Sequence, residues 1–204
     1  MTSKNSLVAF ILGLLIGGGA VYVGTMDMHN SHSHGDTHPI GYADSADQVH
    51  VHSDFLVIVD GEQIDFTADK YQTTSEQELA EDIHLHDNIG HVIHRHADDV
   101  TLGEFFDSFG YTLTNDCFTQ SDSLENCSDE NELLVFVNDE RMSNPSEYTN
   151  QEEDRILIYY GDPNDNELIR ASLLTITDEA CIYSGTCPER GIAPAESCGL
   201  TCDI

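Results

Sequence analysis

The feature that most constrains the fold is the segment IHLHDNIGHVIHRH at residues 83–96, in which histidines alternate with apolar residues on both sides of a turn. Alternation with a period of two is typical of β-strands, so the segment predicts a hairpin whose three-residue loop ends at Gly90, in the left-handed position. In this register His84 lies opposite His94, and directly opposed residues point to the same side of a sheet. Four imidazoles are therefore expected on one face, those of His84, His86, His94 and His96.

Residues 49–59, VHVHSDFLVIV, repeat the pattern with apolar side chains on one parity and His50, His52 and Asp54 on the other. If this strand lies beside the hairpin, six imidazoles and a carboxylate share one surface. Imidazole nitrogens bind zinc at roughly 2.0–2.1 Å, and opposed strand positions can bring several of them to one ion. Imidazole suits zinc, copper, nickel and iron alike. We therefore expect a transition-metal site, for copper or zinc, with Asp54 as an additional candidate ligand.

The remaining elements predict a small α+β domain that is rich in β-strands. Thr101 and Glu104 form a capping box for one short helix that ends at Gly110, and Leu133–Val137 and Arg155–Tyr160 are two further strands. A hairpin, one helix and two strands is the element order of a β-grasp sheet. The expected core is the following set: Val57, Val59, Phe105, Phe106, Phe109, Val135, Val137, Ile156 and Ile158.

The N-terminal residues 1–25 contain LVAFILGLLIGGGAVYVG at positions 7–24, an uncharged apolar run near the lower limit of the roughly 17–25 residues that cross a bilayer. Lys4 precedes the run and acidic residues follow it, so the positive-inside rule predicts a single-pass anchor with the rest of the chain outside the cell. A cleaved signal peptide is the alternative.

Residues 26–48 follow as a flexible tether without hydrophobic periodicity. Its methionines and histidines would suit copper and predict an arm that captures metal near the membrane. These additional candidate ligands are Met26, Met28, His29, His32, His34 and His38.

The six cysteines all lie on the predicted outer side, where disulfides persist. Cys117 and Cys127 close a short polar loop and are the expected pair. Residues 49–162 form the expected metal-binding domain, and residues 163–204 form a tail stapled by disulfides. The tail cysteines allow three connectivities, with a four-thiolate zinc site as the competing interpretation. They are Cys181, Cys187, Cys198 and Cys202.

The chain carries 38 Asp and Glu against 7 Lys and Arg, a formal net charge of −31 that excludes nucleic acid as a partner because phosphates would be repelled.

The function expected from the histidine pattern, the anchor and the tether is metal capture, storage or delivery rather than turnover. Two alternatives stay open. One is a metalloenzyme with an open coordination position, in which Asp54 or Asp87 would act as general base. The other is a cell-surface interaction module with a structural metal.

Three segments, HVHSDFLVIVDG, IHLHDNIGHVIHRH and VTLGEFF, occur in this order between residues 49 and 162. In this respect the chain resembles a family of small membrane-anchored, histidine-rich proteins of archaea and candidate-phylum bacteria. The hairpin is the most specific part of the likeness. The resemblance implies an anchored extracytoplasmic domain rich in histidine, and it implies no activity.

Overall fold

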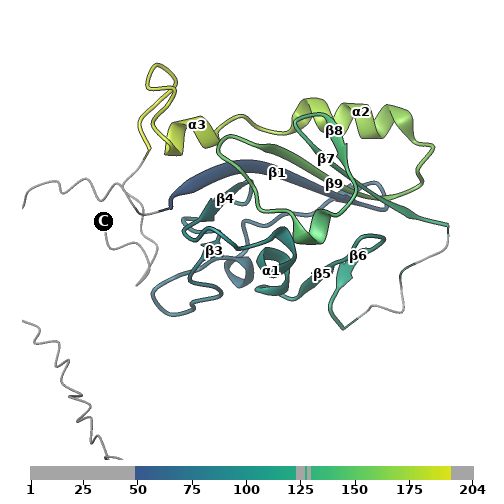
Figure 1. Cartoon of the computed structure of the whole chain (residues 1–204), viewed down its shortest axis with the longest axis horizontal. Helices are drawn as coiled ribbons and strands as arrows, with labels where there is room; N and C mark the ends of the chain where they lie inside the picture. The colour runs from purple at the N-terminus through teal and green to yellow at the C-terminus, as the bar shows by residue number, and fades with distance from the viewer. Residues whose placement is uncertain (1–48, 123–126, 128–129, 194–204) are drawn as a thin grey trace, which may run out of the picture. The chain divides into compact units, whose positions relative to one another are not determined.

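The computed structural model describes residues 49–122, 127 and 130–193, which form a small mixed α/β domain (Figure 1). Within these residues, a seven-stranded sheet has the order β3-β4-β1-β9-β7-β8, with β2 paired to β1, and β5 and β6 form a separate hairpin. The strands are β1 (Val51–Val59), β2 (Glu62–Gln63), β3 (Ile83–His84), β4 (Val92–Arg95), β5 (Tyr111–Leu113), β6 (Phe118–Gln120), β7 (Glu132–Val137), β8 (Glu140–Met142) and β9 (Arg155–Gly161). The helices are α1 (Leu102–Asp107), α2 (Asn166–Thr175) and α3 (Ala180–Tyr183), with 3₁₀ turns η1 (Asp69–Tyr71) and η3 (Pro145–Glu147).

Strand β1 lies at the centre of the sheet, parallel to β9 and antiparallel to β4. Its interior residues are buried on both faces, because successive side chains point to opposite sides and each side meets a different hydrophobic cluster. Phe55 and Val57 pack in the larger cluster, and Leu56 and Ile58 pack in the smaller one. The sheet is thus covered on both faces.

The larger cluster lies under α1 and the β5–β6 hairpin. Helix α1 begins with the predicted capping box, in which the Thr101 side chain accepts from the Glu104 amide while Glu104 accepts from the Thr101 amide. Leu102, Phe105 and Phe106 are fully buried. The predicted core residues all belong to this cluster, with Val59 and Phe109 at its partly buried edge.

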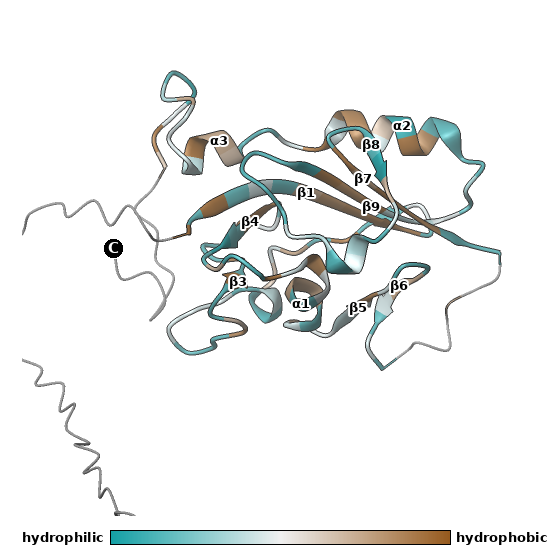
Figure 2. Ribbon diagram, viewed as in Figure 1, coloured by the Kyte–Doolittle hydropathy of each residue, from teal (hydrophilic) through white to brown (hydrophobic). Residues whose placement is uncertain are grey.

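The smaller cluster contains residues of a second helix, α2, whereas the sequence predicted only one helix. Helix α2, in the segment predicted as a disulfide-stapled tail, covers the second face of the sheet with Ile169, Leu168 and Leu173. Figure 2 shows α2 alternating between hydrophobic and hydrophilic surface beside the hydrophobic strands β7 and β9. The second helix forms because a central strand that is apolar on both parities needs cover on both faces.

The turns agree with the predicted registers, with one correction. The hairpin pairs His84 with His94 as predicted. The left-handed residues of its turn are Asp87 and Asn88, with φ of 57° and 59°, and not Gly90. A Cβ on Gly90 would lie 2.6 Å from the backbone nitrogen of Thr67, so a close approach of two chain segments requires the glycine.

Two disulfides join described cysteines. Cys117 bonds to Cys127, as predicted. In the tail, Cys181 bonds to Cys187, which is one of the pairings that the sequence left open. Cys198 and Cys202 lie outside the described residues, as do the predicted anchor and tether. None of the helices among the described residues combines the length and apolar character needed to cross a membrane.

Candidate metal centre

Three adjacent strands bring the histidines of the sequence together. His94 of β4 is the cross-strand partner of His84 on β3 and of His52 on β1. Because opposed residues share a face, these three imidazoles form a row across the sheet. His50, directly before β1, and His96, directly after β4, lie two positions from His52 and His94 and continue the same face. The expected neighbourhood of β1 and the hairpin is therefore present.

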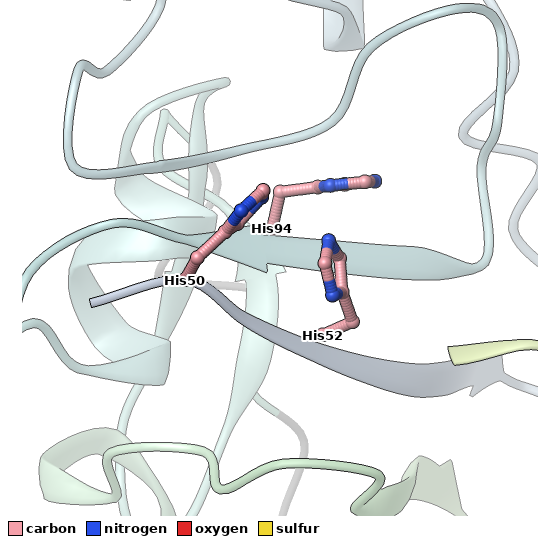
Figure 3. Close-up of side chains that lie close together, drawn as sticks. All are labelled: His50, His52 and His94. Carbon is pink, nitrogen blue, oxygen red and sulfur yellow. The ribbon is translucent and has the colours of Figure 1, made fainter. Parts of the chain in front are cut away.

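Among the histidines on this face, His50, His52 and His94 are the group whose ligand nitrogens lie close enough together to hold one metal ion. Their ligand nitrogens all lie within 4.8 Å of one another, and Figure 3 shows the three imidazoles gathered at the start of β1. Nitrogens bound to one tetrahedral zinc at ~2.0–2.1 Å are about 3.3 Å apart, so small side-chain rotations suffice to bring these three to a common ion. These three residues could hold a metal.

All six predicted histidines belong to one cluster, here called the six-histidine cluster. Neighbouring imidazoles form a closed circuit. Their ring centroids lie 4.6 Å (His50–His52), 4.7 Å (His52–His94), 3.9 Å (His94–His86), 5.6 Å (His86–His84), 5.0 Å (His84–His96) and 4.7 Å (His96–His50) apart. Each histidine therefore has at least two imidazole neighbours, and His84 and His94 also stack on each other at 6.4 Å.

Most of this cluster is removed from solvent. His52, His84, His86 and His94 are at most 2% exposed, whereas His50 is exposed and His96 is half-buried. Burying a polar side chain costs free energy unless its polar atoms bind something. The four buried imidazoles therefore need partners for their ring nitrogens, and a bound ion is one partner that suits them.

Hydrogen bonds to Nδ1 orient three of the rings. His84 Nδ1 lies 3.0 Å from the carbonyl oxygen of Ala80, and His86 Nδ1 lies 2.8 Å from Asp87 Oδ2. Both oxygens can only accept, so Nδ1 carries the proton and Nε2 presents its lone pair. This is the arrangement in which metal-binding histidines are usually held, with the second ring nitrogen bonded to a carbonyl or carboxylate.

His52 is held in the same way from the C-terminal segment. Its Nδ1 lies 3.0 Å from Ser184 Oγ, and that hydroxyl donates to Glu152, which leaves an oxygen lone pair to accept from His52. Tyr183 packs beside the same site, with its ring centroid 5.9 Å from His52 and 5.5 Å from His94. No spacing in the sequence indicated Ser184 or Tyr183, because both reach the site from α3, more than a hundred residues after β1.

The surroundings of the cluster carry charge of both signs. Arg95 lies between His94 and His96 in β4, points to the other face and donates to the Asn150 carbonyl at 3.1 Å. Burial lowers the pKa of its guanidinium, and the nearby carboxylates of Asp98 and Glu152 act in the opposite direction.

The two candidate acidic residues are both engaged in hydrogen bonds. Asp54 accepts from the Thr177 hydroxyl and from the backbone amides of Glu179 and Ala180, the latter two at 2.9 Å. Its carboxylate thus holds the start of α3. Asp87 accepts from His86, as described above.

The other histidines of the chain lie apart from this cluster or outside the described residues. His91 lies in the same hairpin, but its Nε2 bonds Glu179 Oε2 at 2.8 Å. The tether ligands are outside the described residues: Met26, Met28, His29, His32, His34 and His38.

Comparison with known proteins gives no match, since no family model, no curated protein and no solved structure matches this chain. The function therefore has to be inferred from the chemistry of the site.

Proposed function

We propose that this chain is a membrane-anchored, extracytoplasmic metal-binding protein that captures, stores or delivers copper or zinc. The observation that carries the proposal is the convergence of His50, His52 and His94, whose ligand atoms lie within 4.8 Å of one another. Three imidazoles on one face, one of them exposed, give an ion both a binding site and a route of entry from solvent.

Copper and zinc are proposed because the ligands are imidazoles. Both metals bind neutral imidazole nitrogen, whereas magnesium and calcium prefer oxygen ligands. The Nδ1 hydrogen bond of His52 suits a metal site in general, since it leaves Nε2 as the ring nitrogen for the ion.

The location outside the cell rests on two observations. The apolar run at residues 7–24 is long enough to anchor the chain, and its flanking charges favour an external C-terminal part. The Cys117–Cys127 and Cys181–Cys187 disulfides suit an oxidising compartment.

Binding is favoured over turnover by the state of the carboxylates. A metalloenzyme that uses general-base catalysis, the alternative considered for this chain, needs a base within reach of the reacting group. Asp54 is used to hold α3 and Asp87 to orient His86. Both candidate bases thus have structural partners, which supports a role in holding the metal.

We infer that the fold is of the β-grasp type. Its support is the sheet order, in which the long strand β1 and the last strand β9 are parallel and central, flanked by β4 on one side and by β7 and β8 on the other. The same segments carry the resemblance to the small anchored histidine-rich proteins, and we propose that this chain belongs with them.

The test is the metal content of the full-length chain after loading with zinc or copper(II) and removal of weakly bound ions. We expect His50→Ala/His52→Ala to retain about one metal equivalent fewer than the unmodified chain. The matched control is His91→Ala, which removes a histidine of the same domain outside the six-histidine cluster and should retain metal normally. Equal retention by the double variant and the unmodified chain would refute the proposal.

A further inference from the structure

The six-histidine cluster contains more imidazoles than one ion can use. Its circuit divides into two runs of three consecutive neighbours: His50, His52 and His94 on one side, and His86, His84 and His96 on the other. A tetrahedral metal bound by three imidazoles accounts for the first run and leaves the second unexplained.

We propose that His84, His86 and His96 hold a second metal ion beside the first, so that the cluster is a two-metal centre. This inference rests on the proposed function and extends it. Two imidazoles on one tetrahedral ion, bound at ~2.0–2.1 Å, have centroids about 5 Å apart. The separations of 5.6 Å for His84–His86 and 5.0 Å for His84–His96 match that spacing, whereas His86 and His96 are not ring neighbours and meet only through His84.

The orientation of two of these rings supports the second position independently. His84 and His86 each bond through Nδ1 to an oxygen that can only accept, which directs both Nε2 lone pairs away from these partners. His86 is fully buried, and its Nε2 finds no hydrogen-bond partner among the described residues. A buried acceptor without a partner costs free energy, which a metal–nitrogen bond would offset.

His96 is the member of the second set that has to move. Among the described residues only the first trio has all its ligand atoms within 4.8 Å. His96 is half-buried and stacks on both His84 and His50, at interplanar angles of 24° and 29°. The proposal therefore requires this more accessible ring to turn toward His84 and His86 when the second ion binds.

The two positions adjoin one another through His94 and His86. These two rings have centroids only 3.9 Å apart, and each belongs to a different trio. Two ions held by the two trios would therefore be neighbours, and we expect the electron spins of two copper(II) ions bound there to couple.

The experiment loads the full-length chain with copper(II) and measures retained metal together with the electron paramagnetic resonance spectrum. We expect His84→Ala/His86→Ala and His50→Ala/His52→Ala each to retain about one equivalent fewer than the unmodified chain. The unmodified chain should show the half-field signal of a coupled pair, and both double variants should lack it. His91→Ala should match the unmodified chain in both measurements.

Buried histidine substitutions can impair folding, so Asp87→Asn provides a second variant. Asp87 has φ of +57°, a conformation that asparagine also adopts, so the turn is preserved while the carboxylate that orients His86 is lost. We expect affinity at the second position to fall by about 10-fold, the lower end of the range for loss of such a partner. Retention at the first position should be unchanged.

The outcomes separate the two proposals. An uncoupled copper spectrum of the fully loaded unmodified chain, with metal lost only in His50→Ala/His52→Ala, would overturn the second position and leave the proposed function standing. If neither double variant lost metal, both would be wrong. Loss confined to His84→Ala/His86→Ala would overturn the two-metal centre and also the first trio as the primary site.

Discussion

At the scale of single residues, Gly90 shows how a position outside the histidine pattern keeps the hairpin in place. Its backbone passes so close to the loop before η1 that a Cβ would lie 2.6 Å from Thr67 N and 2.7 Å from Phe66 C. Both are backbone atoms, which cannot rotate away as a flexible side chain can. The absence of a side chain therefore lets the hairpin that carries four of the clustered histidines lie against its neighbour.

Gly90→Ala should consequently destabilise the domain. Overpacking of this kind costs about 1–3 kcal/mol, and urea unfolding of the metal-free chain would measure it. Gly191→Ala is the control, since its nearest neighbour would be the Ile182 side chain at 3.6 Å, an ordinary contact. A stability of Gly90→Ala within about 0.5 kcal/mol of the unmodified chain would show that the loop yields without strain.

The histidine pattern itself could be predicted from the sequence, because it depends only on local alternation and one turn. The pairing of His84 with His94 and the common face of His50 and His52 needed no knowledge of distant residues. The role of Gly90 could not be predicted in the same way, since the atoms it approaches belong to a separate loop. Nor could the burial of the imidazoles, which depends on what covers the face.

At the scale of elements, α3 is held in place by a single buried carboxylate. Asp54 of β1 is 1% exposed and accepts from Thr177, Glu179 and Ala180 at the start of this four-residue helix. Such a short helix has little stability of its own. Through Asp54, β1 fixes the helix that delivers Ser184 and Tyr183 to the histidines.

Asp54→Asn should therefore loosen α3. The amide places an N–H group against backbone N–H donors, so at least one bond to a buried charge is lost, at a cost of about 2–3 kcal/mol. Hydrogen exchange at the Glu179 and Ala180 amides would measure the opening. Asp165→Asn is matched in chemistry, because Asp165 caps α2 from an exposed position and asparagine caps equally well. Slow exchange at both amides in Asp54→Asn would contradict this role.

An exposed ion pair with a defined pH dependence joins Asp178, which lies before α3, to Arg190 in the loop after it. Asp178 Oδ1 accepts from Arg190 Nη2 at 2.7 Å, and this bond is the main cause that lowers the pKa of Asp178. A lowered folded pKa means that the ion pair stabilises the closed loop above the ordinary carboxyl pKa of about 3.9. That contribution is lost as pH falls through the lower value in the folded chain.

Arg190→Gln should raise the pKa of Asp178 towards its ordinary value. Carboxyl carbon chemical shifts followed by NMR through acidic pH would give the titration midpoint directly. Asp65 serves as the internal control, since bonds from Thr67 in its own loop lower its pKa and do not involve Arg190. An unchanged Asp178 midpoint in the variant would assign its lowered pKa to another cause.

Helix α2 could have been predicted from the sequence, whereas α3 could not. Leu168, Ile169 and Leu173 have helical spacing after the capping residue Asp165, although the cysteines nearby favoured the interpretation as a tail. Helix α3 has too few residues for a periodic signal. Its position depends on hydrogen bonds to Asp54, more than a hundred residues earlier in the chain.

At the scale of the whole molecule, the net charge of −31 acts in opposite directions on folding and on metal capture. Like charges in a compact domain repel one another, so dissolved salt should stabilise the fold by screening them. The same negative field attracts divalent cations and raises the rate at which they reach the site. Salt screens that attraction as well.

Raising sodium chloride from about 0.01 M to 1 M, which shortens the screening length from about 30 Å to 3 Å, should therefore raise the melting temperature of the metal-free chain and slow metal association. We expect association to slow by 10-fold or more, within the range attributed to electrostatic steering. Stopped-flow mixing with zinc would measure the rate, and thermal unfolding would measure stability on the same samples.

The control is His50→Ala/His52→Ala, which leaves the acidic surface unchanged. Its melting temperature should rise with salt as in the unmodified chain, while it lacks the salt-sensitive binding phase. If salt left the zinc association rate unchanged while raising stability, the acidic surface would serve solubility or folding in salt and would have no part in capturing the metal.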